Sequence, residues 1–243
     1  MTRRPWPARI ARQFAIGLLS LALASVVVVV LFRWVPVPVT SFMIRDWIVS
    51  ADKKRPGAAT PHDWVPWPEI SKQAAVAVIA SEDQKFLEHQ GFDLAAIDKA
   101  LTDAQRGRRQ RGASTISQQV AKNLFLWPGH SWLRKGFEAW FTLWIEWLWP
   151  KQRILEVYLN SAEFGRGVWG VEAASRHFFH KSASKLDRSE AALLAAVLPN
   201  PKHFRVDRPS AYVQQRQAWI MRQMTMLGGV RLLDGLDEGK GWR

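Results

Sequence analysis

Residues 112–125 read GASTISQQVAKNLF, and this stretch decides the fold class of the chain. Polar residues recur in it every four positions, at Ser114, Gln118 and Lys122. Apolar residues recur at the same interval, at Ile116, Val120 and Leu124. On an α-helix such sets lie on separate faces, so that one face can pack while the other binds a ligand. We therefore predict a helix that Ser114 caps and that ends near Leu126, before Pro128.

The same spacing of apolar residues continues on both sides of this stretch, with few alternating runs typical of strands. Glycine and proline separate the apolar segments, which indicates an all-α domain. Helices are predicted in these places: from Pro68 towards Gly91, from Asp93 to Gly107, from Trp132 to Trp149, around residues 154–159, and from a capping box of Asp187 and Glu190 to Leu198. A tight loop is predicted over the glycines between residues 165 and 170.

The composition limits the size and the partners of the protein. The chain has 243 residues, so once about 50 N-terminal residues are set aside the rest fits one domain. Its formal net charge of +13 calls for an anionic partner: nucleic acid, an anionic lipid surface or a phosphorylated substrate. The absence of cysteine excludes disulfides and thiolate metal sites.

The apolar run from Phe14 to Phe32 can span a bilayer, since 19 helical residues reach roughly 30 Å. Arginines precede it at positions 3, 4, 9 and 12, which predicts a cytoplasmic N-terminus and an exported domain. The predicted organisation is a cytoplasmic tail (1–13), an uncleaved transmembrane signal anchor (14–32), a juxtamembrane linker (33–66) and the exported domain (67–243). Export excludes nucleic acid, so the basic loop at Arg106, Arg108, Arg109 and Arg111 is expected either to contact lipid headgroups or to be solvated.

Two acidic residues lie in contexts that could support chemistry. Glu82 follows an apolar helix and lies near Ile79 and Phe86, where desolvation would raise the pKa of its carboxyl into the range of a general base. Glu138 sits among tryptophans, where a carboxylate is costly unless it faces a polar cleft or nearby cations. Taken alone, an Asp–Glu pair such as Glu82 and Asp83 is more often a solvated surface feature. The position of Glu138 on its helix indicates a site and not a surface face.

Four segments together resemble the domain of glycosyltransferase family 51: EDQKFLEHQGFD (82–93), GASTISQQVAKNLF (112–125), RKGFE (134–138) and KQRILEVYLNSAEFGRG (151–167). The similarity runs from about Trp67 to Arg222, and the chain looks like a monofunctional peptidoglycan glycosyltransferase. The resemblance implies a lysozyme-like all-α fold and inverting polymerisation of lipid II into glycan strands, with undecaprenyl diphosphate as the leaving group. It also implies a place in the bacterial inner membrane, with lipid II, the growing glycan strand, membrane lipids and other cell-wall synthesis proteins as partners.

The resemblance further implies roles for individual residues. Glu82 would be the general base, and Glu138 would help to orient the donor diphosphate, directly or through a divalent cation (Mg²⁺ or Mn²⁺). No covalently bound cofactor is expected. The predicted substrate-binding residues are Ser114, Thr115, Gln118, Gln119, Lys122, Arg134, Lys151, Arg153, Asn160 and Glu163. The residues predicted to support the first motif are Asp83, Phe86, His89 and Gly91.

Two other classes of protein compete with this interpretation. A lytic glycosidase could use a catalytic glutamate on a similar fold, but cleavage needs no cradle for a diphosphate. A non-catalytic scaffold of the wall-building machinery could use the anchor alone, but it would not need both Glu82 and Glu138. The SASK sequence at 182–185 is interpreted as coincidental, because no transpeptidase domain fits in the residues that follow.

Overall fold

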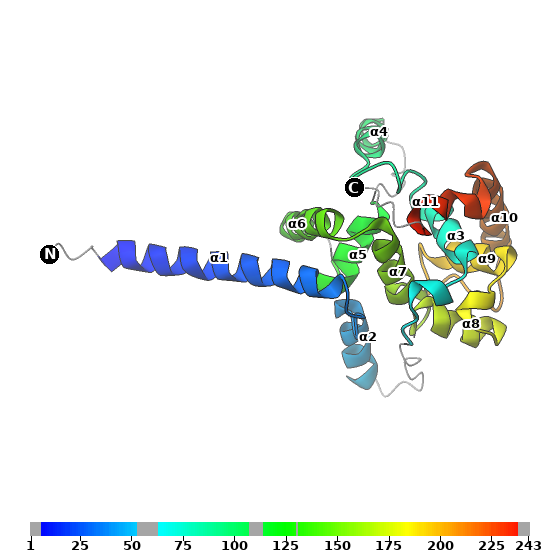
Figure 1. The fold of residues 1–243 in the computed structure, drawn as a ribbon, viewed down its shortest axis with the longest axis horizontal. Helices are drawn as coiled ribbons and strands as arrows, with labels where there is room; N and C mark the ends of the chain where they lie inside the picture. Colours follow the sequence, from blue (N-terminus) through cyan, green and yellow to red (C-terminus); the bar gives the residue numbers. More distant parts are fainter. Residues whose placement is uncertain (1–5, 53–62, 107–113, 130, 238–243) are drawn as a thin grey trace. The chain divides into compact units, whose positions relative to one another are not determined.

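The computed structural model describes residues 6–52, 63–106, 114–129 and 131–237. Within these residues the secondary structure is helical apart from one short antiparallel pair of strands (Figure 1). The all-α prediction is thereby confirmed. The chain divides into two units, Met1–Val35 and Pro36–Arg243, which are described separately.

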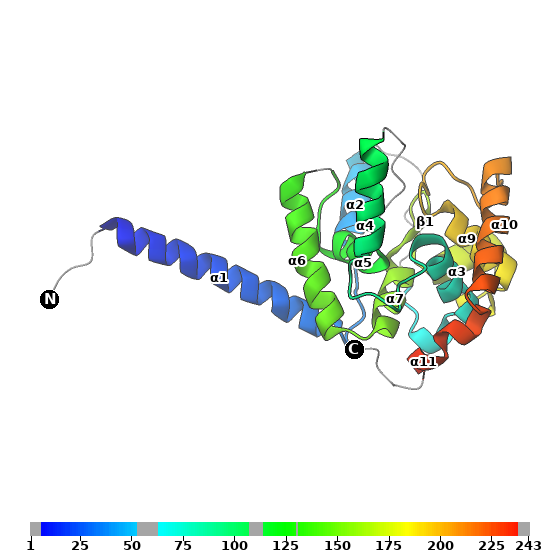
Figure 2. The same ribbon diagram turned by 90° about the horizontal axis from the view of Figure 1, so that it is seen from above.

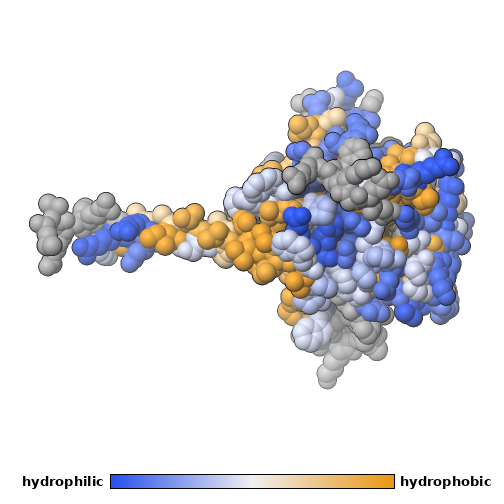
Figure 3. All heavy atoms as spheres, viewed as in Figure 1, coloured by the Kyte–Doolittle hydropathy of each residue, from blue (hydrophilic) through white to orange (hydrophobic). Residues whose placement is uncertain are grey.

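The first unit is dominated by one helix, α1 (Trp6–Phe32). Its stretch from Arg9 to Phe32 is long and apolar enough to cross a membrane, with a mean hydropathy of 2.8. Most of its large apolar side chains are exposed, so that hydrophobic residues cover much of the helix surface (Figure 3). The predicted anchor of residues 14–32 lies inside this stretch. The exposed apolar surface fits lipid better than it fits water.

The second unit begins with a helix in the segment that was predicted to be a linker, α2 (Ser41–Asp52). The Ser41 hydroxyl donates to the carbonyl oxygens of Asn123 (3.0 Å) and Leu126 (2.5 Å), and Met43 is buried. The segment is therefore attached to the domain. Further along α2, Trp47 and Ile48 are exposed.

The core is built around α3 (Lys72–Glu82), which is buried on all sides from Ala74 to Ala80. The helices α9 (Arg188–Val197) and α10 (Ala211–Met226) pack against it (Figure 2). The prediction that this helix begins at Pro68 was wrong. Pro68 lies in the short 3₁₀ helix η1 (Trp67–Glu69), and the extended backbone at Ile70 separates it from α3, which Ser71 caps.

A second group of helices consists of α5 (Ile116–Phe125), α6 (Trp132–Leu148) and α7 (Lys151–Ser161), with α5 packed against the other two. The cap of α5 is Thr115 and not Ser114 as predicted. The Thr115 hydroxyl accepts from the Gln118 N–H while the Gln118 side chain accepts from the Thr115 N–H, which completes a capping box. This reciprocal pair explains why the helix begins one residue later.

The remaining elements complete the second unit: α4 (Leu94–Gln105), β1 (Glu163–Gly165), β2 (Val168–Trp169), α8 (Val171–Phe179), η2 (Ala183–Lys185), η3 (Gly229–Leu233) and α11 (Asp234–Asp237). The predicted glycine loop is the turn of the β1–β2 hairpin, in which Gly167 has a φ of 74°. The predicted capping box of Asp187 and Glu190 is confirmed at the start of α9. Of the predicted basic loop only Arg106 lies inside the described residues.

Candidate active site

Glu82 is the last residue of α3, so the buried helix carries its carboxylate to the edge of the core. The side chain is 14% exposed. Gln119 of α5 donates from Nε2 to Oε2 of Glu82 (3.0 Å), and the Tyr158 hydroxyl donates to Oε1 of the same Gln119 (3.2 Å). Tyr158 thereby fixes the orientation of the amide, so that its NH₂ group faces Glu82. On the other side Nη2 of Arg216 lies 3.5 Å from Oε1 of Glu82.

Burial raises the pKa of the Glu82 carboxyl above its usual 4.5. The hydrogen bond from Gln119 and the positive charges of Arg216 and Lys122 lower this pKa. The negative charge of Asp83 raises it, by less than burial does. A carboxylate with a raised pKa is a stronger base than an exposed one, and this is the property that a general base near neutral pH requires. The sequence prediction that desolvation raises this pKa is confirmed.

A cleft of about 230 Å³ opens beside Glu82. Its walls come from the end of α3, the following loop, the start of α4 and the residues before α5: Glu82, Asp83, Gln84, Lys85, Asp93, Ala96, Ser114 and Thr115. Ser114 is exposed at this wall. A group entering the cleft would therefore meet the Glu82 carboxylate among other polar side chains.

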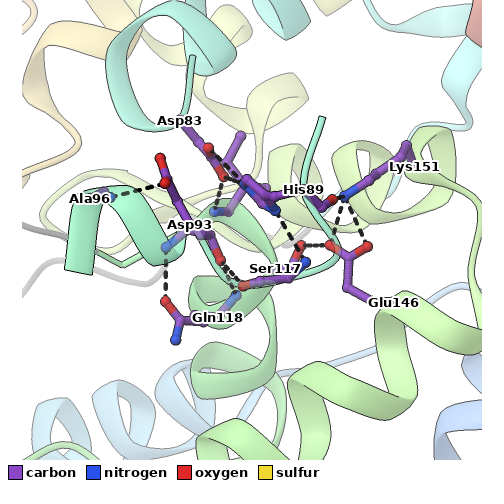
Figure 4. A network of polar contacts seen from close by, with 11 residues as sticks. Asp83, His89, Asp93, Ala96, Ser117, Gln118, Glu146 and Lys151 are labelled. Atoms are coloured by element: carbon purple, nitrogen blue, oxygen red, sulfur yellow. Dashed lines mark hydrogen bonds and ion pairs between the residues drawn. The ribbon is translucent and has the colours of Figure 1, made fainter. Parts of the chain in front are cut away.

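The loop after Glu82 is fixed by Asp83 and His89 (Figure 4). The Asp83 carboxylate accepts from Nε2 of His89 (2.9 Å) and from the backbone N–H of Ile116 at the start of α5 (3.0 Å). Since Nδ1 of His89 accepts from the Gly91 N–H (3.1 Å), the ring proton lies on Nε2. Asp83 thus ties the loop to the N-terminus of α5, where a negative charge is favourable.

Gly91 is required where the loop turns back. Its φ is 86°, and a Cβ at this position would lie 2.8 Å from Cγ2 of Thr142 and 2.9 Å from Cγ of Glu146. Its carbonyl accepts from the Thr115 hydroxyl (2.7 Å). The glycine therefore allows the loop to pack directly against α6 and α5.

Lys151 also anchors this loop, next to His89 (Figure 4). Its ammonium donates to the His89 carbonyl (2.6 Å) and to Glu146 (2.8 Å), and it lies 4.4 Å from the centre of the Phe86 ring. Glu146 also accepts a short hydrogen bond from Ser117. Both members of the Lys151–Glu146 pair are 6% exposed, so each charge is balanced by the other. The predicted role of Lys151 in binding substrate remains a prediction.

Glu138, the second predicted acid, lies on α6 and is 2% exposed. Nη1 of Arg134 donates to its Oε2 (2.9 Å), and the Lys135 ammonium forms a short ion pair with its Oε1. Buried charges normally occur paired in this way. Glu138 therefore holds two cations in place on the first turn of α6.

Lys122 of α5 lies within electrostatic reach of both acids. Burial lowers the pKa of its ammonium. The carboxylates of Glu138 and Glu82 raise this pKa, and the positive charges of Arg134 and Lys135 lower it further. Among the described residues no carboxylate lies within ion-pair distance of Lys122, and its ammonium lies 6.0 Å from the centre of the Phe42 ring. Lys122 is therefore a cation near both acids that is paired with neither.

The donor atoms near Glu138 do not fit a cation held by the protein alone. Each Glu138 oxygen already faces a positive side chain, and the described residues contain no cluster of three histidine, cysteine or acidic side chains that could hold a metal. A divalent ion at this place would compete with Arg134 and Lys135.

The other residues predicted to bind substrate make contacts with other parts of the protein. Arg153 pairs with Glu156 (2.8 Å) and lies over the Trp64 ring. Asn160 clamps the backbone of Val65 through two hydrogen bonds, of 3.0 and 2.9 Å. Thr115 and Gln118 form the cap of α5, and Glu163 accepts from the Gly167 N–H in the hairpin. Their predicted roles in binding substrate remain predictions.

Arg216 was not predicted from the sequence, although it contacts Glu82. It lies on α10, outside the four segments that carry the resemblance, and its neighbours Gln215 and Gln217 give no hint of a site. Glu146 was missed because an acid near the end of a tryptophan-rich helix does not reveal that it pairs with Lys151. Only the packing of α10 against α3 and of α6 against α7 brings Arg216 and Glu146 to these partners.

The fold and the site define a class of protein: a helical protein with a glutamate of raised pKa beside a cleft, a second glutamate paired with two cations, and an apolar helix long enough to cross a membrane. The sequence model for the transglycosylase family matches residues 52–225, and the chain belongs to this family. Similar proteins named biosynthetic peptidoglycan transglycosylase occur in Pseudomonas putida strain GB-1 (54% identity), Pseudomonas entomophila strain L48 (53%) and Pseudomonas savastanoi pv. phaseolicola strain 1448A (51%). The alignments cover 94–96% of this chain and 97–98% of those relatives.

Proposed function

We propose that the protein is a peptidoglycan glycosyltransferase that polymerises lipid II into β-1,4-linked glycan strands and releases undecaprenyl diphosphate. The observation that carries the proposal is the position of Glu82 at the end of α3, where its carboxylate lines a cleft and accepts a hydrogen bond from Gln119. The charges of Glu82 and Glu138 both act on the ammonium of Lys122. A base, an available cation and a pair of held cations are the groups that glycosyl transfer from a diphosphate donor requires. Membership of the transglycosylase family and the names of the relatives support the same activity.

In the proposed reaction Glu82 accepts the proton from the 4-hydroxyl of the acceptor sugar. The oxygen then attacks the anomeric carbon of the donor from the face opposite the leaving group, so the configuration inverts. The bond between this carbon and the diphosphate oxygen breaks, and its electron pair leaves with the diphosphate. The raised pKa of Glu82 favours the proton transfer.

The departing diphosphate needs positive charge that is already in position. Lys122 is available for this role, and Glu138 holds Arg134 and Lys135 nearby. We propose that Glu138 acts by orienting these two cations towards the diphosphate. No step in this mechanism passes through a metal ion, because the Glu138 oxygens are already paired.

The proposed location is the bacterial inner membrane, with a single crossing by α1. The arginines before the apolar stretch favour a cytoplasmic N-terminus, which puts the catalytic domain on the outer side of this membrane. Lipid II and the growing strand are the proposed partners, together with membrane lipids. Other wall-synthesis proteins are further proposed partners.

Polymerisation of purified lipid II by the full-length protein tests the function. Glu82→Gln keeps the size of the side chain but removes the base, and we expect it to form no glycan. Glu88→Gln is the matched control, since Glu88 is exposed in the same loop and should leave the reaction intact. Separation of the products by size distinguishes the alternatives: long strands from the wild type support the proposal, whereas cleavage of preformed glycan without polymerisation would indicate a lytic enzyme.

A further inference from the structure

The helix α10 reaches the end of α3 with two side chains spaced seven residues apart. Nη2 of Arg216 lies 3.5 Å from Oε1 of Glu82, and Oε1 of Gln223 accepts from Nε2 of Gln84 (3.1 Å). A separation of seven residues is close to two helical turns, so both side chains project from the same face of α10. The helix therefore contacts the catalytic residue and the start of its loop together.

Arg216 is more deeply buried than an arginine usually is. Its side chain is 20% exposed, and its Nε is buried without an acceptor among the residues that the structure describes. Buried donors without partners are rare in folded proteins and call for an explanation. Arg222, nearly two turns further along the same helix, is exposed to solvent as arginines usually are.

We propose that Arg216 is a positioning residue for Glu82, and that it and Gln119 hold the two carboxylate oxygens from opposite sides, one from α10 and one from α5. The inference rests on the proposed role of Glu82 as the base. With each oxygen facing a different donor, the carboxylate has little freedom to rotate. Because the guanidinium of Arg216 is a cation, its contact also favours the ionised carboxylate.

Several groups around Glu82 raise or lower the pKa of its carboxyl, and Arg216 is one of them. Burial raises the pKa of Glu82, and Asp83 adds to this, whereas Gln119 of α5, Arg216 of α10 and Lys122 of α5 lower it. Tyr158 of α7 also faces the site, but burial raises the pKa of its hydroxyl, so it stays neutral. Lys122 is the cation assigned to the diphosphate. Arg216 is therefore the positive group near Glu82 that remains free to serve the base alone.

The rate of polymerisation by the full-length protein, measured as a function of pH, tests this role. For Arg216→Gln we expect the acid limb of the profile to move to higher pH. If the limb moves by one pH unit, the rate at pH values below it should fall about tenfold. Arg216→Lys keeps the charge and should hold the limb near its wild-type position. Arg222→Gln removes the same charge from an exposed position on the same helix and should leave the profile unchanged.

A uniform loss of rate in Arg216→Gln with an unmoved limb, or an equal movement of the limb in Arg216→Lys, would overturn the proposal. A second measurement does not depend on activity: the ionisation of Glu82 followed by ¹³C NMR of the full-length protein in detergent, with Glu82→Gln to assign the signal. The midpoint should rise in Arg216→Gln, and an unchanged midpoint overturns the inference. If the midpoint rises but the wild type forms no glycan, the contact stands and the proposed function fails.

Discussion

Lys122 combines a desolvated ammonium with two neighbouring acids, and this setting suits it to meet the charge that appears on a departing diphosphate. We expect Lys122→Ala to slow polymerisation by about 2–4 kcal/mol in the transition state, or roughly 30- to 1,000-fold. The turnover number on saturating lipid II is the measurement. Lys185→Ala, at an exposed position, is the control. An unchanged turnover number for Lys122→Ala would remove this residue from the mechanism.

The raised pKa of Glu82 also has a consequence for stability. A carboxyl whose pKa is higher in the folded than in the unfolded protein favours folding below its unfolded pKa of about 4.5, and this contribution is lost as the pH rises through the folded pKa. Glu82→Gln removes the buried charge. We therefore expect the variant to melt at a higher temperature than the wild type at pH 7, by about 2–4 °C per kcal/mol gained.

Thermal unfolding at a series of pH values measures this difference. The gain should shrink as the pH falls towards 4.5, because the wild-type carboxyl then takes up its proton. Glu88→Gln should show no such trend, since its side chain is exposed. A variant that is less stable than the wild type at pH 7 would mean that the contacts of the carboxylate outweigh its desolvation.

At the scale of elements, the pair of Lys151 and Glu146 joins α7 and α6 to the loop that follows Glu82. Lys151→Met would leave Glu146 buried without its cation, and we expect a loss of about 3–5 kcal/mol in the free energy of unfolding. The double variant Glu146→Gln, Lys151→Met should lose less, because no unpaired charge remains. Lys185→Met serves as the exposed control in the same denaturant titrations. Equal losses in the single and double variants would contradict the pairing.

The elements also show what the sequence could and could not predict. Helices α5, α6 and α7 were predictable because their apolar residues recur at helical intervals and Pro128 and Pro150 separate them. The start of α3 could not be predicted, because Pro68 suits the first turn of an α-helix and a 3₁₀ turn equally well. The structure places Glu82 and Glu138 as the motifs suggested, but it places Lys151 in an internal ion pair. A sequence gives the charge of a lysine, whereas its partner depends on which helix packs against it.

For the whole molecule, the exposed apolar side chains of the second unit indicate a contact with the membrane that adds to α1. On α6, Trp132 and Trp147 are 93% and 76% exposed, and Trp47 of α2 is 71% exposed. Tryptophan is favoured at the boundary between lipid and water. Residues 1–35 hold five arginines and no acidic residue, so most of the net charge of +13 stays on the rest of the chain and would attract anionic lipids. We therefore predict that a chain lacking residues 1–35 still binds vesicles that contain anionic lipid.

Flotation of this shortened chain with vesicles, at low and high salt, measures the binding. Trp132→Ser combined with Trp147→Ser should reduce the bound fraction at both salt concentrations, because the lost contact is apolar and salt screens only the charges. Trp219→Ser on α10, where the side chain is 37% exposed, is the matched control and should bind as the parent does. If the shortened chain does not float at all, α1 alone holds the protein at the membrane and the aromatic face of α6 has another role.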